Sequence, residues 1–222
     1  MDRESALNRI LALSDEIRHH NHLYYIDSEP VISDFEFDRM IEELISLEKE
    51  FPEFLFPDSP SQQVGGGITK SFEQVVHKYP MLSLSNTYSE EEIRDWEARI
   101  HKILGESSEY VCELIFDGVA IGLTYRDGIL VQAVTRGDGV QGDDVTTNVK
   151  TIRSIPLRLR QSGYPEEFEI RGEIIMPHRS FERLNRQWYE EGEEPFANPR
   201  NAASGILKIQ DSAEVDRRGL DG

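Results

Sequence analysis

The sequence is short of three things: cysteine, long hydrophobic runs and positive charge. Cys112 is the only cysteine, so no disulfide bond can form within the chain, and a reducing compartment such as the cytoplasm is expected. No hydrophobic run approaches the roughly 18 residues of a membrane span. The charged N-terminus, with its helical periodicity, does not fit a signal peptide. We therefore expect no membrane partner.

The charge balance narrows the function further. The 222 residues include 24 Lys and Arg against 42 Asp and Glu, a formal net charge of −18. Because phosphate backbones repel such a surface, the composition argues against a protein that binds DNA by itself. It allows a domain that handles a nucleotide while other domains hold nucleic acid. The length fits one large domain, or a medium domain and a small one.

The first part of the chain has helical patterns. Apolar residues recur at helical spacing in residues 2–27. Ser33 followed by Glu36 is a capping-box pattern, which predicts that a second helix begins there. Residues 52–70 are rich in proline, glycine and serine and indicate a linker. We expect a small helical unit over residues 1–66 and a larger unit over residues 70–222.

The larger unit turns from helix to strand. Alternating residues predict strands, and Asp127-Gly128 predicts a hairpin between two of them. Helices combined with an antiparallel-leaning sheet indicate the α+β class. The expected strands are residues 110–116, 119–125, 129–135 and 166–177, and the expected helices are residues 89–104 and 180–191.

Residues 137–142, GDGVQG, match the G-x-G-x-x-G form of a dinucleotide-binding fingerprint. That fingerprint requires a helix after the glycines and then a parallel strand. The residues that follow reach Pro156 too soon, and the preceding strands indicate a hairpin rather than a crossover. A glycine-rich turn is expected, and an oxidoreductase built on this motif is disfavoured.

Three further features have both a structural and a functional interpretation. His19, His20 and His22 suggest a metal site, but no supporting ligand spacing lies nearby, so exposed helix residues and no protein metal ligands are expected. Cys112 shares a predicted strand face with apolar residues, which favours a core residue over a nucleophile. The basic segment 150–160 either meets phosphates or forms an ordinary exposed face.

Acidic and basic residues gather near the ends of the predicted strands, beside glycine turns. Side chains two apart share a strand face, so these residues form small polar sets. The sets are either salt bridges on surface strands or a site for the phosphates and sugar of a nucleotide. They consist of Glu113, Ile115 and Asp117 on one strand, Glu169, Arg171 and Glu173 on another, and Arg136, Arg200 and Lys208 elsewhere.

Several longer motifs resemble those of one family. CELIFDG, TRGDGVQGDDVTTNVKTIRSIPLRL, EIRGE and FANPRNAASG follow the order found in the adenylation domain of bacterial NAD-dependent DNA ligases. RHHNHLYYIDSEPVISDFEFD resembles the small helical subdomain that grips nicotinamide mononucleotide in that family, and PMLSLSN fits it too. The resemblance implies a helical subdomain followed by a nucleotidyltransferase domain with antiparallel-rich sheets and flanking helices.

The resemblance also implies a three-step reaction. In the family, a lysine amine attacks the α-phosphate of NAD, expels nicotinamide mononucleotide and becomes a lysine-AMP phosphoramidate. AMP then moves to the 5′-phosphate of nicked DNA, and the 3′-hydroxyl at the nick displaces AMP and seals the strand, in replication and repair. The implied cofactors are NAD and Mg²⁺, which offsets phosphate charge. Nicked double-stranded DNA is the implied partner of a full-length family member.

The position of the family's nucleophile departs from the family pattern. The family motif is K-x-D-G, and this sequence has I-F-D-G, which puts Ile115 at the lysine position. Isoleucine has no lone pair with which to attack phosphorus. No lysine occurs between Lys102 and Lys150. We therefore expect that the chain cannot adenylate itself.

Other positions take implied roles from the matching motifs. The site for the adenosine and phosphate part of NAD comprises Asp117 near the nucleophile and ribose, Glu113 for adenine, Arg136 and Glu173 for ribose, Arg200 and Lys208 for phosphates, and Ser83 and Leu84 along its wall. The implied grip on the nicotinamide nucleotide consists of Tyr24, Tyr25, Asp34, Phe35, Glu36, Phe37 and Asp38.

Two further departures lead to further expectations. The family commonly has tyrosine at Phe37, and one lost hydrogen bond there would weaken nicotinamide recognition by about 0.5–1.5 kcal/mol. The later lysine-bearing motifs and the DNA-clamping regions of the family do not occur in the sequence, so we expect an exposed apolar edge and self-association. An alternative function is a non-catalytic module, derived from such a ligase, that binds NAD or a partner.

Overall fold

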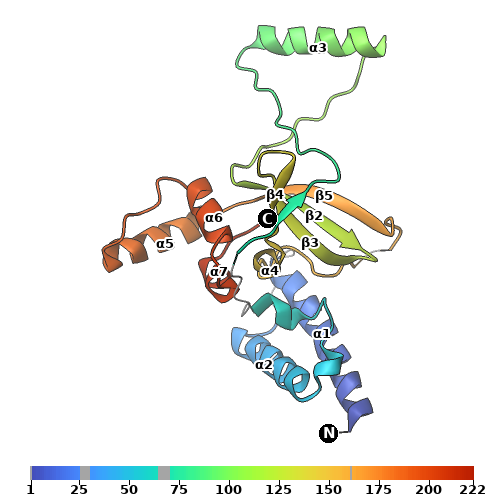
Figure 1. Ribbon diagram of the computed structural model, residues 1–222, viewed down its shortest axis with the longest axis vertical. Helices are drawn as coiled ribbons and strands as arrows, with labels where there is room; N and C mark the ends of the chain where they lie inside the picture. Colours follow the sequence, from blue (N-terminus) through green and yellow to red (C-terminus); the bar gives the residue numbers. More distant parts are fainter. Residues whose placement is uncertain (1, 26–30, 65–70, 161) are drawn as a thin grey trace.

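Helices and antiparallel strands make up the fold, as expected for the α+β class. The structure is a computed structural model and describes residues 2–25, 31–64, 71–160 and 162–222. Figure 1 shows a helical unit at one end, the strands in the middle, the isolated helix α3 (Glu90–Leu104) at the opposite end and the C-terminal helices to one side.

The N-terminal helical unit consists of α1 (Arg3–Tyr25) and α2 (Asp34–Glu50). Both helices were predicted, and the capping box at Ser33 is present, with its side chain accepting from the Glu36 backbone N–H. The expected linker contains the short 3₁₀ helices η1 (Pro52–Phe54) and η2 (Pro60–Val64), while residues 65–70 lie outside the described residues. Burial of apolar side chains holds the pair together; these are Ile10, Leu13, Ile17, Leu44 and Leu47.

The central sheet has three antiparallel strands in the order β3-β2-β5. They are β2 (Val119–Arg126), β3 (Ile129–Thr135) and β5 (Glu167–Ile174), and the Asp127-Gly128 turn joins the first two as predicted. The sequence did not predict the smaller pair of β1 (Gln74–Val76) with β4 (Gln141–Asp143). Because β2 and β3 form a hairpin, the strand before GDGVQG has no crossover, which fits the glycine-rich turn and not a dinucleotide fingerprint.

The strand predicted over residues 110–116 is wrong. Residues 107–117 have no regular structure, and Leu114 and Ile115 are 87% and 89% exposed. A strand needs a hydrogen-bonded neighbour, and none of the strands that the structure describes pairs with this segment. Cys112 is therefore exposed and not the core residue that the pattern suggested.

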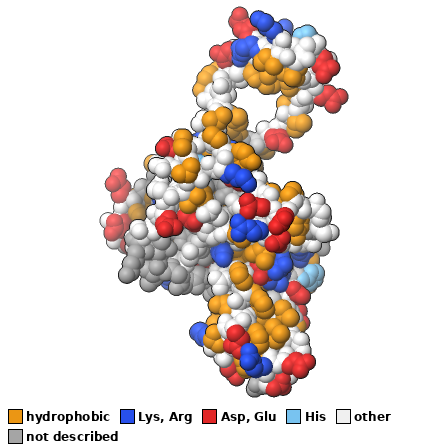
Figure 2. Space-filling model, turned by 45° about the vertical axis from the view of Figure 1, so that its right-hand side comes forward, with side chains coloured by type: hydrophobic (Ala, Val, Ile, Leu, Met, Phe, Trp, Pro, Cys, Tyr) orange, Lys and Arg blue, Asp and Glu red, His pale blue; other side chains and the backbone are white. Residues whose placement is uncertain are grey.

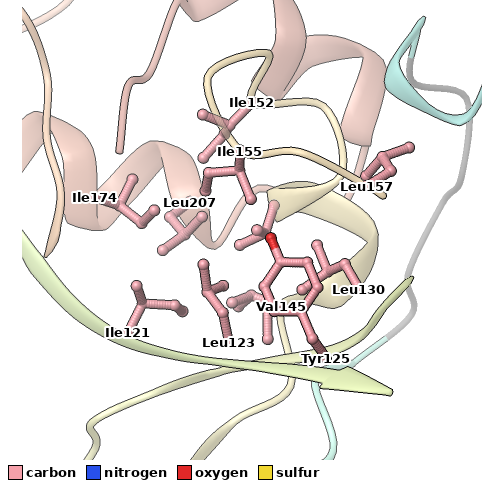
Figure 3. Close-up of a cluster of buried hydrophobic side chains, with 12 residues drawn as sticks. Ile121, Leu123, Tyr125, Leu130, Val145, Ile152, Ile155, Leu157, Ile174 and Leu207 are labelled. Carbon is pink, nitrogen blue, oxygen red and sulfur yellow. The ribbon is translucent and has the colours of Figure 1, made fainter. Parts of the chain in front are cut away.

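The main core lies on one face of the central sheet. Figure 3 shows Ile121, Leu123 and Tyr125 of β2 facing Leu207, Ile174 and residues of the segment after β4. That segment includes the short helix α4 (Thr146–Val149), whose Val149 is fully buried. The opposite face of the sheet is thereby left for polar residues.

A second cluster unites the C-terminal helices. The helices are α5 (His178–Glu191), which was predicted, and α6 (Pro199–Leu207) and α7 (Ser212–Arg218), which were not. Ile206 packs in this second cluster and Leu207 in the main core, so α6 joins the two. This burial fixes α6 against the sheet.

The helical unit contacts the rest of the chain through charged residues. The carboxylate of Asp58 is 3% exposed and lies between the guanidinium groups of Arg18 and Arg158. Lys150 Nζ donates to the carbonyl of Pro57 at 3.2 Å. Part of the basic segment 150–160 is thus used to hold the helical unit, so its charge is not all available to phosphates.

Tyr125 provides a test of the main core. Its hydroxyl donates to the carbonyl of Pro156 at 2.8 Å, and burial raises the pKa of Tyr125 to about 12. Tyr125→Phe should cost about 1 kcal/mol at neutral pH through the lost hydrogen bond. Above pH 10, Tyr125 ionises in the unfolded chain but is still protonated in the folded chain. The chain with Tyr125 therefore loses folding stability as the pH rises from 10 through about 12. Urea unfolding from pH 8 to 11 should show the difference between the two chains shrinking, and a constant difference would contradict this.

Candidate adenylation site

The candidate site is built around the Asp117-Gly118 turn, immediately before β2. The backbone N–H of Gly118 donates to Glu173 Oε1 of β5 at 3.0 Å. Arg200, in the first turn of α6, donates from Nη1 to Asp117 Oδ1 at 2.9 Å. Three segments that are far apart in the sequence thus meet at one turn.

Strand register explains how Glu173 reaches this turn. Ala120 of β2 pairs with Glu173 of β5, and Gly122 pairs with Arg171. Because side chains alternate, Glu173, Arg171 and Glu169 share one face, as the sequence pattern predicted, and the strand register puts that face opposite the core. The Arg136 backbone N–H donates to the Ala120 carbonyl at 2.9 Å, which places the start of the glycine-rich turn beside the same face.

The glycine-rich turn is tightly packed. Asp138 Oδ1 accepts from the backbone N–H groups of Gln141 and Val140, and these bonds lower the pKa of the Asp138 carboxyl. A Cβ on Gly142 would lie 1.7 Å from the carbonyl oxygen of Thr135, so only glycine fits there. The glycines of GDGVQG therefore serve a sharp reversal of the chain.

One wall of the site comes from residues 77–83. His77 Nε2 lies 3.0 Å from the carbonyl oxygen of Arg136, and Arg136 Nη1 donates to Ser83 Oγ at 3.4 Å. Ser83 and Arg136 line a shallow hollow of about 260 Å³ together with the glycine-rich turn. Sequence reasoning identified Ser83 and Arg136 but missed His77, because the segment is mostly irregular and shows no periodicity.

Arg171 holds this wall against the sheet. Its guanidinium donates to the carbonyls of Tyr79 and Pro80 at 2.6 and 2.9 Å, and to Glu169 at 2.8 Å. A groove of about 820 Å³ continues from here along the sheet face, past Gly122 and Arg126. The polar sets seen in the sequence thus include salt bridges as well as site residues.

The structure does not bring every expected residue to this turn. Lys208, after α6, pairs with Asp143 of β4 at 2.6 Å rather than with the turn. Glu113 and Ile115 lie in the exposed segment before the turn, and the side chain of Leu84 is almost fully exposed. None of the hydrogen bonds or ion pairs that the structure describes at Asp117 involves these residues.

The residues expected to grip the nicotinamide nucleotide lie elsewhere, on α1 and α2. Figure 1 places these helices at the opposite side of the sheet from α3. Glu36 caps α2, and the N–H of Ser33 lowers the pKa of its carboxyl, while Phe37 packs against the helical core. Asp38 is exposed. The side chains of Tyr24, Tyr25, Asp34 and Phe35 lie outside the described residues.

The donor set at the turn fits part of a dinucleotide. A carboxylate such as that of Glu173 accepts from sugar hydroxyls, and guanidinium groups such as those of Arg136 and Arg200 match phosphate oxygens.

A metal site is a separate question. Among the described residues, no three His, Cys, Asp or Glu side chains lie together as ligands. No helix in the described ranges is long and apolar enough to cross a membrane.

Comparisons with known proteins found matches over both units of the chain. The NAD-dependent DNA ligase adenylation domain matches residues 69–222, and the DNA ligase-like N-terminal NAD+-binding domain matches residues 3–65. DNA ligases of Cytophaga hutchinsonii and Parabacteroides distasonis are 58% and 60% identical over 100% and 96% of this chain. The DNA ligase of Chlorobaculum parvum is 56% identical over 99%.

The chain spans about a third of the length of these relatives, with shares of 33%, 32% and 34%. The matched regions nevertheless cover both the helical unit and the sheet with its site. The chain therefore belongs to the family of NAD-dependent DNA ligases, and it corresponds to that family's N-terminal adenylation part.

Proposed function

We propose that the chain is the adenylation-domain portion of an NAD-dependent DNA ligase that seals nicks in replication and repair. The observation that carries the proposal is the convergence of Glu173 and Arg200 on the Asp117-Gly118 turn. In this proposal nicked DNA is the partner of the longer protein. This acidic chain alone is poorly suited to bind phosphate backbones.

In this proposal the site binds the adenosine and phosphate part of NAD. Arg136 and Glu173 contact the ribose, Glu113 recognises adenine, and Arg200 and Lys208 serve the phosphates. Arg200 and its partner Asp117 are 53% and 75% exposed, so their ion pair is worth less than about 1 kcal/mol. A phosphate can therefore take the place of the carboxylate at little cost.

Ile115 stands at the position of the family's nucleophilic lysine, and we propose that this chain does not adenylate itself. A hydrocarbon side chain supplies no nucleophile. Lys208, a lysine near the sheet, is engaged with Asp143. The replacement favours a second candidate function, a non-catalytic module that binds NAD or a partner without chemistry.

The remaining parts of the proposal concern the helical unit and the surroundings. We assign residues 1–66 to nicotinamide-nucleotide binding, with Phe37 lacking a hydroxyl that would strengthen it, and residues 70–222 to the adenylation core. Magnesium belongs with the phosphates, whose charge it offsets. We also propose that the chain is cytoplasmic, a location that the single cysteine favours. Self-association through an exposed edge is a further part of the proposal.

NAD binding is tested by calorimetry. The chain should bind NAD saturably, and Glu173→Ala or Arg200→Ala should weaken binding about tenfold, the loss of one hydrogen bond to a charged group. Arg179→Ala, on the exposed side of α5, is the matched control and should leave the affinity unchanged. If millimolar NAD gives no heat in any variant, the chain is not an NAD-binding module.

A further inference from the structure

A cleft lies between the helical unit and the segment that follows α4. Its volume of about 460 Å³ falls within the roughly 300–1,000 Å³ of pockets that hold small molecules. Residues between 18 and 22 of α1, with Asp58 and Pro60, line one side of the cleft, and residues between 153 and 164 line the other. No residue assigned to the candidate adenylation site is among the described residues that line it.

The cleft concentrates positive charge in an acidic chain. Four of its lining residues are arginines, whereas Asp58 is the one carboxylate among the described residues that line it. Figure 2 shows Lys and Arg side chains where the helical unit meets the rest of the molecule. Because the whole chain has a formal net charge of −18, this local reversal of sign favours an anion here over the surrounding surface. The arginines are Arg18, Arg153, Arg158 and Arg160.

The ion pairs around the cleft leave part of this charge uncompensated. Arg18 and Arg158 share one oxygen, Oδ2, of the buried Asp58 carboxylate. Arg160 is exposed and donates to the carbonyl oxygen of Arg18 at 3.4 Å, a neutral acceptor, and it forms no ion pair in the described part of the chain. Two further pairs join Arg18 to Asp15 and Arg153 to Asp216. Four guanidinium groups are thus matched by three carboxylates, and Arg160 has donors available for an anion.

Between the arginines the cleft is apolar. Leu157 is buried and belongs to the main core, and Leu159 packs against that core and is partly buried. Pro60 lines the cleft from the side of the helical unit, and Pro156 and Tyr164 line it from the other side. Proline side chains have almost no freedom to lose when a ligand binds. An apolar body placed here would be removed from water, which favours binding.

We propose that this cleft binds an organic phosphate, that is, a phosphate group carried on an apolar body about the size of one or two rings. A phosphate has three terminal oxygens and accepts from several guanidinium groups at once, whereas a carboxylate has only two oxygens. The apolar body lies against Leu157 and the prolines. Because the ligand contacts residues of both units, it also holds the helical unit in place. The proposal does not depend on nucleotide binding at the candidate adenylation site.

Calorimetry with three compounds tests the two halves of the ligand. 1-Naphthyl phosphate has both the anion and the apolar body, inorganic phosphate has only the anion, and 1-naphthol has only the body. We expect 1-naphthyl phosphate to bind one to one, and at least about tenfold more tightly than either of the other compounds. No binding of 1-naphthyl phosphate, or equal binding of either simpler compound, would overturn the proposal.

Substitutions at Arg160 locate the binding. Arg160→Ala should weaken binding of 1-naphthyl phosphate about tenfold, the loss of one hydrogen bond to a charged group, and Arg160→Lys, which keeps the charge, should recover most of that loss. Arg160 is exposed, so both variants should keep their fold, which circular dichroism checks. The matched control is Arg186→Ala, at an exposed arginine of α5, which should bind as the original chain does. Unchanged affinity in Arg160→Ala would contradict the proposal.

Saturating NAD separates this cleft from the candidate adenylation site. The affinity for 1-naphthyl phosphate should be the same with and without NAD, because the two sites share no described residue. Displacement by NAD would show that the compound occupies the nucleotide site, and the cleft proposal would then fail while the proposed function stands. Conversely, a chain that binds 1-naphthyl phosphate through Arg160 but gives no heat with NAD would support the cleft and contradict the proposed NAD binding.

Discussion

Incubation with NAD and magnesium is expected to leave this chain without covalent AMP, whereas the Ile115→Lys variant, in a chain extended to the length of the relatives, should gain one AMP. The difference is all or none, because isoleucine offers no lone pair and a lysine amine can form a phosphoramidate. Ile115 is almost fully exposed, so the lysine should not disturb the fold. Intact-mass measurement distinguishes the two results.

The matched control for this experiment is Ile115→Arg in the same extended chain. Arginine supplies a positive charge at position 115 but stays protonated and does not attack phosphorus. It should therefore gain no AMP. If the Ile115 chain gained AMP, the assignment of the nucleophile position would be wrong. If the lysine variant gained none, the defect of the site would extend beyond Ile115.

Much of the fold follows from local patterns in the sequence. The capping box at Ser33 and apolar residues at helical spacing predict α1 and α2, residues 89–104 were expected to form the helix that is α3, and alternation with an Asp-Gly turn predicts the β2–β3 hairpin. Helix α6 was missed, because it is only nine residues long and includes Gly205, a residue that disfavours helix. Its position depends on burial of Ile206 and Leu207, which only the assembled cores reveal.

The same limit explains the one clear error in the sheet. Residues 110–116 alternate as a strand does, yet alternation records a preference and not a partner. With no described strand beside it, the segment stays irregular. In the candidate site, by contrast, the sequence identified the residues but not their arrangement. Motifs identified Asp117, Glu173 and Arg200 one by one, but their meeting depends on strand register and on the packing of α6.

Gly118→Ala is expected to damage the site through the fold itself. A Cβ on Gly118 would lie 2.1 Å from the carbonyl oxygen of Ile174, a backbone atom that cannot turn away. Relief requires the turn to move off β5, which breaks the bond from Gly118 N–H to Glu173 and displaces Asp117 from Arg200. We expect a loss of about 3 kcal/mol in the free energy of unfolding, from overpacking and the lost hydrogen bond.

Gly172→Ala provides the matched control for this loss. Gly172 lies on β5 next to Glu173, and a Cβ there would meet no atom within 4 Å. The free energy of unfolding of Gly172→Ala should stay within about 1 kcal/mol of that of the unsubstituted chain, since only backbone entropy and strand preference change. Thermal melts should place Gly118→Ala roughly 6–12 °C below the original chain. Equal midpoints for the two variants would show that the turn is not held against β5, and the geometry proposed for Glu173 and Asp117 would then fail with it.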